Sequence, residues 1–179
     1  MALTLLLGGA RSGKSALAVQ MATRWRGPVT VIVTGEARDE EMAERIRRHR
    51  AARPPSWDTV EEPVDLDGAI SGTAAEACAV VDCLTLWVSN LLERGEEDAE
   101  VTDRARTAAD LASRRSAPTI VVSNEVGSGI VPMNALARRY RDLLGEVNAI
   151  WADVAASNLL VVAGRVLPLS EPADLGTDG

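Results

Sequence analysis

The sequence contains no phenylalanine, one tyrosine, one histidine, one lysine and two cysteines among its 179 residues. Without phenylalanine, the core must consist mainly of leucine, valine, isoleucine and alanine. A guanine-reading N-K-x-D motif is excluded, because the only lysine, Lys14, belongs to a different motif. The cysteines, Cys78 and Cys83, are five positions apart in one apolar run, where a strand points them to opposite faces. We therefore expect both cysteines to be core residues, and neither a disulfide nor a metal site is expected from them.

Long apolar runs are also missing. The first run, Leu3–Leu7, is short and has no basic residues before it, which predicts no signal peptide, and no segment approaches the roughly 20 apolar residues of a membrane span. The net charge of −7 argues against non-specific binding to nucleic acid or anionic membranes. The composition predicts one cytoplasmic domain over residues 1–169 and a flexible acidic tail over 170–179.

A phosphate-binding loop is the clearest motif. Residues 8–15 match the pattern G-x-x-x-x-G-K-[ST] in full, between an apolar run and a segment that can form a helix. In such a loop backbone N–H groups surround the phosphates, and the helix N-terminus adds partial positive charge. Lys14 is expected to reach the β- and γ-phosphates and Ser15 to ligate Mg²⁺. The predicted loop consists of Gly8, Gly9, Ala10, Arg11, Ser12, Gly13, Lys14 and Ser15.

Short apolar runs alternate with longer amphipathic segments along the chain. The runs are continuous, as in strands that are buried on both faces. Strands are predicted at 3–7, 29–34, 79–82, 119–123 and 159–163, and helices at 15–25, 39–52, 66–75, 84–92, 101–115 and 134–157. The polar segment 95–100 is predicted to be a solvated loop. This order predicts an α/β fold of P-loop NTPase type, with a mostly parallel sheet and helices on both faces.

Ligands of such sheets bind at the carboxyl ends of the strands. The segments there are 8–15, 34–38, 82–85, 124–129 and 164–165. Asp82 ends a buried run, where P-loop proteins place a carboxylate associated with Mg²⁺. It could also cap the following helix, and the two roles are compatible. No D-x-x-G switch follows Asp82, which argues against a switch GTPase.

The only histidine, His49, shares a predicted helix face with Met42 and Ile46, and this face should turn toward the protein. A lone histidine in such a place is most often a packed residue without a chemical role. Neighbouring arginines could hold a triphosphate beside an imidazole nucleophile, or could form a solvated basic face. These arginines are Arg45, Arg47, Arg48, Arg50 and Arg53. A small P-loop kinase, a nucleotidyltransferase and a nucleotide-binding regulator all remain open on this reasoning.

From Leu3 to about Pro168 the chain resembles the bifunctional adenosylcobinamide kinase / adenosylcobinamide-phosphate guanylyltransferases of cobalamin biosynthesis. The most specific part is Asn-Glu-Val-Gly-Ser-Gly-Ile-Val-Pro at 124–132, together with the helical histidine. Further matches are residues 8–15, Asp39–Met42, Arg45, Ile46, Arg53, Pro54, Trp57, Thr59, Glu61, 82–85, 90–92, Ala137, Arg138, Arg141, Asp142, Gly145 and Asn148. Arg48 stands where some relatives carry a second histidine, and Asp82 where others carry glutamate.

The resemblance implies two reactions that use ATP or GTP. The γ-phosphoryl group passes to the aminopropanol hydroxyl of adenosylcobinamide. A histidine, here His49, is then guanylylated by GTP and passes GMP to adenosylcobinamide phosphate. Lys14 would be catalytic as well, and Mg²⁺ would be held by Ser15 and Asp82. Nucleotide contacts are expected from residues 8–15, Thr34, Gly35, Glu36, Arg50, Ala51, Ala52, Arg53, Glu61 and Asp82. The resemblance also implies a homotrimer, with the 124–132 loop and the helix at 134–157 near subunit contacts.

Overall fold

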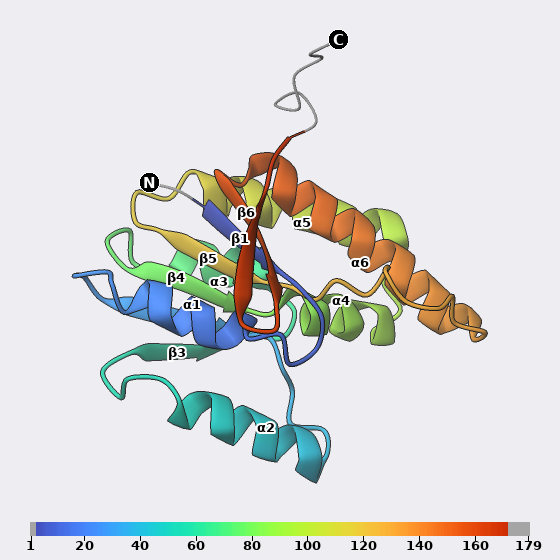
Figure 1. The fold of residues 1–179 in the computed structure, drawn as a ribbon, viewed down its shortest axis with the longest axis horizontal. Helices are drawn as coiled ribbons and strands as arrows, with labels where there is room; N and C mark the ends of the chain where they lie inside the picture. The colour runs from blue at the N-terminus through green and yellow to red at the C-terminus, as the bar shows by residue number, and fades with distance from the viewer. Residues whose placement is uncertain (1–2, 172–179) are drawn as a thin grey trace.

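The computed structural model describes residues 3–171 as one seven-stranded sheet with helices packed on it (Figure 1). The strand order is β3-β2-β4-β5-β1-β6-β7, and all neighbouring pairs are parallel except β6 and β7. The elements are β1 (Leu3–Leu7), α1 (Lys14–Ala22), β2 (Val29–Val33), α2 (Glu40–Ala51), β3 (Asp58–Glu61), α3 (Leu66–Gly72), β4 (Cys78–Asp82), α4 (Leu84–Glu93), α5 (Asp98–Ser113), β5 (Thr119–Val122), α6 (Ala135–Val154), β6 (Ser157–Val162) and β7 (Arg165–Leu169).

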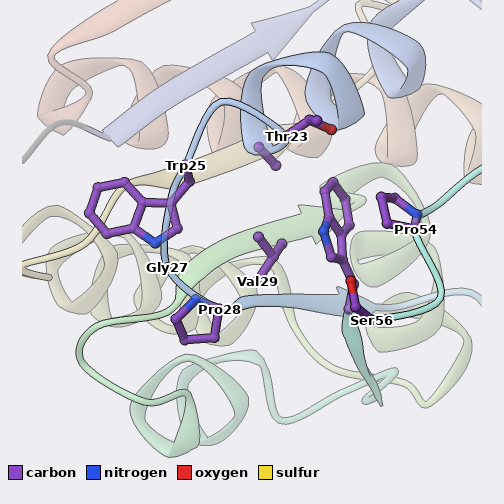
Figure 2. A pocket seen from close by; sticks show the side chains of 9 residues that line it. Thr23, Trp25, Gly27, Pro28, Val29, Pro54 and Ser56 are labelled. Atoms are coloured by element: carbon purple, nitrogen blue, oxygen red, sulfur yellow. The ribbon is translucent and has the colours of Figure 1, made fainter.

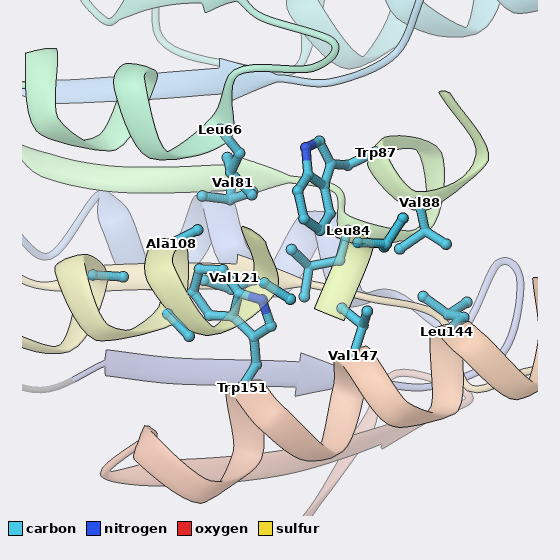
Figure 3. Packing of buried hydrophobic residues seen from close by; sticks show 14 of the residues in the cluster. Leu66, Val81, Leu84, Trp87, Val88, Ala108, Val121, Leu144, Val147 and Trp151 are labelled. Atoms are coloured by element: carbon cyan, nitrogen blue, oxygen red, sulfur yellow. The ribbon is translucent and has the colours of Figure 1, made fainter. Parts of the chain in front are cut away.

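The core lies on both faces of the sheet. On one face, α3, α4, α5 and α6 pack against side chains such as Val81 and Val121, and on the other face α1 packs against the opposite set. Figure 3 shows Trp87 and Trp151 in the larger cluster, where both are fully buried. The Trp87 indole N–H donates to the Val64 carbonyl at 2.8 Å, which satisfies its polar atom. Because the chain has no phenylalanine, these two tryptophans supply the large aromatic side chains of the core.

The predicted α/β fold is confirmed, and all five predicted strands are present. Two further strands, β3 and β7, were not predicted, because both lie at sheet edges and are exposed. β3 carries Asp58 and Glu61 at its ends, and β7 contains Pro168, so neither has the continuous apolar run of a central strand.

Several local predictions were wrong. The helices predicted at 15–25 and 66–75 end earlier, at Ala22 and Gly72. The segment 95–100 is not entirely a loop, because α5 begins at Asp98 and Glu100 accepts a hydrogen bond from the Glu97 N–H, as in a capping box. The last predicted helix does not reach residue 157, since Ala155 leaves the helical conformation and Ser157 begins β6. The capping role that was left open as an alternative for Asp82 is not present, because the N-cap residue of α4 is Cys83.

Both cysteines are free, as predicted, but Cys83 lies beyond the end of β4 rather than within the strand. No helix in the described part of the chain is long and apolar enough to cross a membrane. Of the predicted acidic tail, residues 172–179 lie outside the described residues.

Candidate active site

The predicted phosphate-binding loop joins β1 to α1 at the carboxyl edge of the sheet. Gly8 packs so closely on β6 that a Cβ atom would stand 2.2 Å from the Val161 carbonyl oxygen. The turn after β6 holds the loop from the other side, because the Gly164 N–H donates to the Ser12 carbonyl at 2.8 Å. Gly13 is the N-cap of α1 and has a φ of 105°, a left-handed conformation that favours glycine. The loop is thus shaped by contacts with β6 and the turn after it.

Lys14 is buried inside this loop. Its Nζ atom donates to the carbonyls of Gly8 and Gly9, each at 2.8 Å. Burial lowers the pKa of Lys14; the nearby Arg45 cation lowers it further, whereas the carboxylate of Asp82 acts in the opposite direction. Lys14, Arg45 and Asp82 therefore share one electrostatic environment, although they come from α1, α2 and β4.

Asp82 stands at the end of β4 as the central carboxylate of the site. Its Oδ2 atom accepts a hydrogen bond from Arg53 Nη2 at 2.8 Å and lies 3.4 Å from His49 Nδ1. The Asp82 and Arg53 side chains are 14% and 8% exposed, so this ion pair is largely shielded from solvent. Burial alone would raise the pKa of Asp82, but the contacts with His49 and Arg53 hold it below its usual value. Asp82 is therefore an anion that links the only histidine to the strand ends.

One face of α2 brings His49 to this position. Met42, Ile46, His49 and Arg53 are partly buried, whereas Arg45, Arg47, Arg48 and Arg50 are exposed. Asp39 caps the helix by accepting a hydrogen bond from the Met42 N–H at 2.7 Å. The Ile46 Cδ1 atom would lie 3.7 Å from a Cβ atom on Gly35, just past β2. The predicted inward face is confirmed, and Figure 1 shows α2 outside the β3 edge of the sheet.

The arginine cluster divides into two groups. Arg53 binds Asp82, and Arg47 binds Glu44 on its own helix at 2.6 Å. Arg45, Arg48 and Arg50 have no carboxylate within 4 Å among residues 3–171. Of these three cations, Arg45 is near Lys14 and therefore leaves positive charge at the site that can interact with phosphates.

The other predicted nucleotide contacts lie around this group, in different environments. Thr34 is fully buried and its hydroxyl is bound to the Cys83 backbone. Glu36 is engaged by Arg94 and Arg38, and the Arg94 hydrogen bond is the main reason why its pKa is lowered. Ala51, Ala52 and Glu61 are exposed. Sequence reasoning did not anticipate the role of Arg94, because it lies 58 residues from Glu36 and belongs to no motif.

The 124–132 segment begins beside the phosphate-binding loop. The Glu125 N–H donates to the Gly8 carbonyl at 3.0 Å, which joins the two loops directly. The Asn124 N–H donates to the Thr85 hydroxyl at 2.8 Å, and its carbonyl accepts from Asn148 at 3.0 Å. Farther along, Ile130 and Met133 are 97% and 98% exposed. The start of this segment thus lies at the predicted site, and its far end is an exposed apolar surface.

A separate cavity of about 450 Å³ opens at the amino end of β2, away from the strand ends that carry these residues (Figure 2). Trp25, Pro28, Val29, Pro54 and Trp57 are among its lining residues. The lining contains no ionised side chain. This cavity therefore differs in chemistry from the phosphate-binding site.

The family of cobinamide kinases / cobinamide phosphate guanyltransferases matches residues 4–169 of this chain. The chain belongs to this family. It is 42% identical over 167 residues to the bifunctional adenosylcobalamin biosynthesis protein CobP of Pseudomonas aeruginosa, covering 92% of this chain and 95% of that protein. It is 39% identical over 173 residues to the CobU protein of Salmonella typhimurium, which has the same description, covering 89% and 95%. The resemblance seen in the sequence is confirmed.

Solved structures of more distant proteins resemble this family member in fold. The assembled ATPase EscN of the enteropathogenic E. coli type III secretion system superposes with a TM-score of 0.58 at 12% identity, over 90% of this chain and 43% of that one. A protein from Pyrococcus horikoshii OT3 superposes with a TM-score of 0.56 at 12% identity, over 97% and 88%. At such low identity these likenesses concern the fold alone.

Proposed function

We propose that this chain transfers the γ-phosphoryl group of ATP or GTP to the aminopropanol hydroxyl of adenosylcobinamide and then converts the product to adenosylcobinamide-GDP. In the second reaction, His49 takes GMP from GTP, pyrophosphate leaves, and adenosylcobinamide phosphate accepts the GMP. The observation that carries the proposal is the place of Asp82, which lies 3.4 Å from the only histidine and is near enough to the lysine of the phosphate-binding loop to affect its pKa. A kinase alone would need the lysine but not the histidine.

In the kinase reaction, the substrate hydroxyl oxygen attacks the γ-phosphorus, the bond to the β-phosphate breaks, and the hydroxyl proton is released. Lys14 and the backbone N–H groups of the loop would hold the phosphate oxygens as charge shifts toward the leaving diphosphate. The transfer needs little covalent chemistry from the protein, so positioning and charge neutralisation are its main contributions. Arg45 and Arg50 are exposed cations on α2 that can add to this neutralisation.

Guanylyl transfer uses the α-phosphorus instead. A ring nitrogen of His49 attacks it, the α–β bridging bond breaks, and pyrophosphate departs. A phosphate oxygen of adenosylcobinamide phosphate then attacks the same phosphorus and releases the histidine. Two steps through a nitrogen nucleophile replace one direct attack between two anions, for which electrostatic repulsion is unfavourable. The partly buried Arg53 and Asp82 hold the histidine end of α2 against the sheet.

The proposed Mg²⁺ site would consist of Ser15 and Asp82. Ser15 is partly buried in the first turn of α1, and its hydroxyl makes no hydrogen bond within residues 3–171. No group of three or more histidine, cysteine or carboxylate side chains in the described chain could hold a metal ion by itself. This suits Mg²⁺, which in nucleotide sites binds few protein ligands and completes its shell with phosphates and water. When bound, it would neutralise phosphate charge.

The oligomeric state and location are also part of the proposal. We infer a cytoplasmic homotrimer in which a second copy covers the exposed apolar side chains at the end of the 124–132 segment and the start of α6. These side chains are Ile130, Val131, Met133 and Leu136, between 57% and 98% exposed. Exposed apolar residues gathered in this way are typical of protein contacts. Sedimentation of the wild type should give a trimer, and Met133→Glu should weaken it; a monomeric wild type would contradict the inference.

The test of function uses GTP that is labelled at the α-phosphate. Purified protein is incubated with this GTP and Mg²⁺, denatured, and examined for label on the chain. We expect an acid-labile, base-stable label that is absent from His49→Ala, while Lys14→Ala loses both the label and phosphate transfer to adenosylcobinamide. A separate assay with γ-labelled ATP follows the kinase step. If the wild type transfers the γ-phosphoryl group but carries no label from GTP, and His49→Ala keeps full kinase activity, the chain is a P-loop kinase in which His49 is structural. If GTP binds but neither reaction occurs, the chain is a nucleotide-binding regulator.

A further inference from the structure

The two ring nitrogens of His49 have different surroundings. Nδ1 lies 3.4 Å from Asp82 Oδ2, at the long end of hydrogen-bond distances. No other polar contact of the imidazole is present within residues 3–171, so Nε2 has no protein partner there. The His49 side chain is 35% exposed and that of Asp82 is 14% exposed. One nitrogen therefore faces a buried carboxylate, and the other is free to meet a substrate.

We propose that Asp82 is a positioning residue for guanylyl transfer, which binds the Nδ1–H of His49 and thereby makes Nε2 the atom that attacks GTP. This inference rests on the proposed function. An ionised carboxylate can only accept hydrogen bonds, so the nitrogen that faces it must carry the proton. In a neutral imidazole the other nitrogen then carries the lone pair. The contact with Asp82 thus selects both the tautomer and the nucleophilic atom.

Arg53 and the β4 backbone hold Asp82 in place for this role. Arg53 Nη2 donates to the same Oδ2 atom at 2.8 Å, and Arg53 lies just beyond the end of α2, four residues after His49. From the sheet side, the Thr34 N–H donates to the Asp82 carbonyl at 3.2 Å. The guanidinium also favours the anionic form of Asp82, so the carboxylate does not take the imidazole proton. His49 is therefore oriented by a group that is itself fixed from two directions.

The bond changes balance without any proton transfer at Nδ1. The Nε2 lone pair attacks the α-phosphorus, an N–P bond forms, the α–β bridging P–O bond breaks, and its electrons leave with pyrophosphate. The ring becomes a cation that keeps its Nδ1 proton, next to the Asp82 carboxylate. A phosphate oxygen of the acceptor then attacks the phosphorus, the N–P bond breaks, and its electrons return to Nε2. Asp82 stabilises the positive charge that exists only in the intermediate and the transition states on either side of it.

The positioning role of Asp82 would leave its second carboxylate oxygen available for the proposed metal role. Both side-chain contacts of Asp82 involve Oδ2, and Oδ1 makes no polar contact within residues 3–171. Loss of activity in an Asp82 variant would therefore not separate the two roles. A measurement that reads the imidazole itself is needed.

The chain offers such a measurement, because His49 is its only histidine. Protein labelled with ¹⁵N-histidine gives the nitrogen signals of one imidazole, recorded at about pH 8.5, where an unperturbed imidazole is neutral. We expect a protonated Nδ1 and an unprotonated Nε2 in the wild type, the reverse of the tautomer that a free histidine side chain favours. In Asp82→Ala this preference should be lost. An Nε2–H tautomer in the wild type would overturn the proposal, whether or not the variant folds.

The second readout follows the intermediate. After incubation with GTP, one-bond coupling between ³¹P and ¹⁵N should appear at Nε2, and coupling at Nδ1 would overturn the proposal. Asp82→Ala should slow the appearance of the intermediate by roughly 10²-fold or more while GTP affinity changes less, and Asp82→Glu should restore most of the rate. Equal failure of Asp82→Glu and Asp82→Ala would contradict a positioning role. A wild type with protonated Nδ1 that forms no intermediate would instead reject the proposed guanylyl transfer itself.

Discussion

The hydroxyl group of Thr34 binds both backbone polar groups of Cys83. It accepts a hydrogen bond from the Cys83 N–H at 2.9 Å and donates one to the Cys83 carbonyl at 2.6 Å. Thr34 is itself fully buried, and its carbonyl accepts a hydrogen bond from Asn90 at 2.7 Å. These contacts join the residue after β2 to the residue after β4. The backbone that carries Asp82 is thereby fixed beside the end of β2.

Replacement of Thr34 by valine keeps the shape of the side chain but removes both hydrogen bonds. The Cys83 N–H then loses its partner, whereas the Cys83 carbonyl keeps its hydrogen bond from the Trp87 N–H at 3.2 Å. We therefore expect the free energy of unfolding to fall by about 1–3 kcal/mol. Thr34→Ser retains the hydroxyl and loses one methyl group, which should cost about 1 kcal/mol. Urea unfolding of the two variants measures the difference. Equal stability of the valine and serine variants would show that the hydrogen bonds contribute little.

Thr34 also illustrates which parts of the site are visible in a sequence. Its place after a strand predicts that it lies at the carboxyl edge, and it does. Its burial and its bond to Cys83, 49 positions away, depend on the spacing of two strands that only the fold defines. The phosphate-binding loop was predictable from its motif, and the inward face of α2 was predictable from local periodicity. Contacts such as that of Arg94 with Glu36 join distant segments without any motif.

The fold shows the same contrast between features that a local sequence pattern predicts and features that it does not. Central strands such as β2 and β4 could be predicted from continuous apolar runs, because burial on both faces demands apolar side chains at every position. β3 and β7 could not, since edge strands are partly solvated and tolerate charged residues and proline. The start of α5 was missed because Glu97 and Glu100, which were interpreted as a solvated loop, also suit a capped helix N-terminus.

Gly8 is predicted to be intolerant of any side chain. A Cβ atom there would stand 2.2 Å from the Val161 carbonyl oxygen, a backbone atom that cannot rotate away. We therefore expect Gly8→Ala to lower the free energy of unfolding by roughly 2–4 kcal/mol, because β6 or the loop must shift. Thermal and urea unfolding without nucleotide would measure this.

The adjacent Gly9 is the matched control. A Cβ atom on Gly9 meets nothing within 4 Å, so Gly9→Ala should change the stability by less than about 1 kcal/mol. Both substitutions add one methyl group to neighbouring positions of the same loop. Gly8 differs from Gly9 in its contact with Val161 and also in its φ of 151°, a conformation that residues with a side chain rarely adopt. If Gly9→Ala destabilises as much as Gly8→Ala, the loss would reflect loop flexibility rather than the packing against β6.

Arg115 is predicted to stabilise the fold far from the candidate site. Its guanidinium donates to four backbone carbonyls between α3 and β4, those of Ile70, Thr73, Ala74 and Ala77, at 2.7–3.2 Å. Arg115→Ala should reduce the free energy of unfolding by about 2–4 kcal/mol, because these carbonyls lose charge-assisted partners. Arg114→Ala is the control, since Arg114 is exposed and bonds only to Asp110, an ion pair worth a few tenths of a kcal/mol.

The measurement for this pair is urea unfolding together with the GTP-labelling assay. We expect the rate of guanylylation at 15 °C, well below the unfolding transition, to be the same for Arg115→Ala, Arg114→Ala and the wild type. A lower rate in Arg115→Ala, with the protein still folded, would show that the α3–β4 connection affects the site through β4.

The last prediction concerns alkaline pH. Burial raises the pKa of the Cys78 thiol to about 11, partly offset by Arg115, whereas a thiol in an unfolded chain titrates near pH 8.5. The folded protein therefore binds this proton more tightly than the unfolded chain does. The corresponding stability is fully present below about pH 8.5 and is lost as the pH rises toward 11. For Cys78, which is 1% exposed, the whole effect amounts to about 3 kcal/mol at most.

The expected result is a fall in the free energy of unfolding between about pH 8.5 and 10 under reducing conditions, less steep in Cys78→Ala than in the wild type. Cys83, whose pKa is also raised to about 11 by burial and by the nearby Asp82, accounts for the slope that remains. Burial raises the pKa of Tyr140 as well, but a tyrosine contributes only above its ordinary value of about 10. Lys14, whose pKa is lowered by burial, changes the stability in the opposite direction as the pH rises, so the difference between Cys78→Ala and the wild type is the quantity that reports on the Cys78 thiol. An identical slope in Cys78→Ala and the wild type would mean that Cys78 ionises as readily in the folded protein as in the unfolded chain.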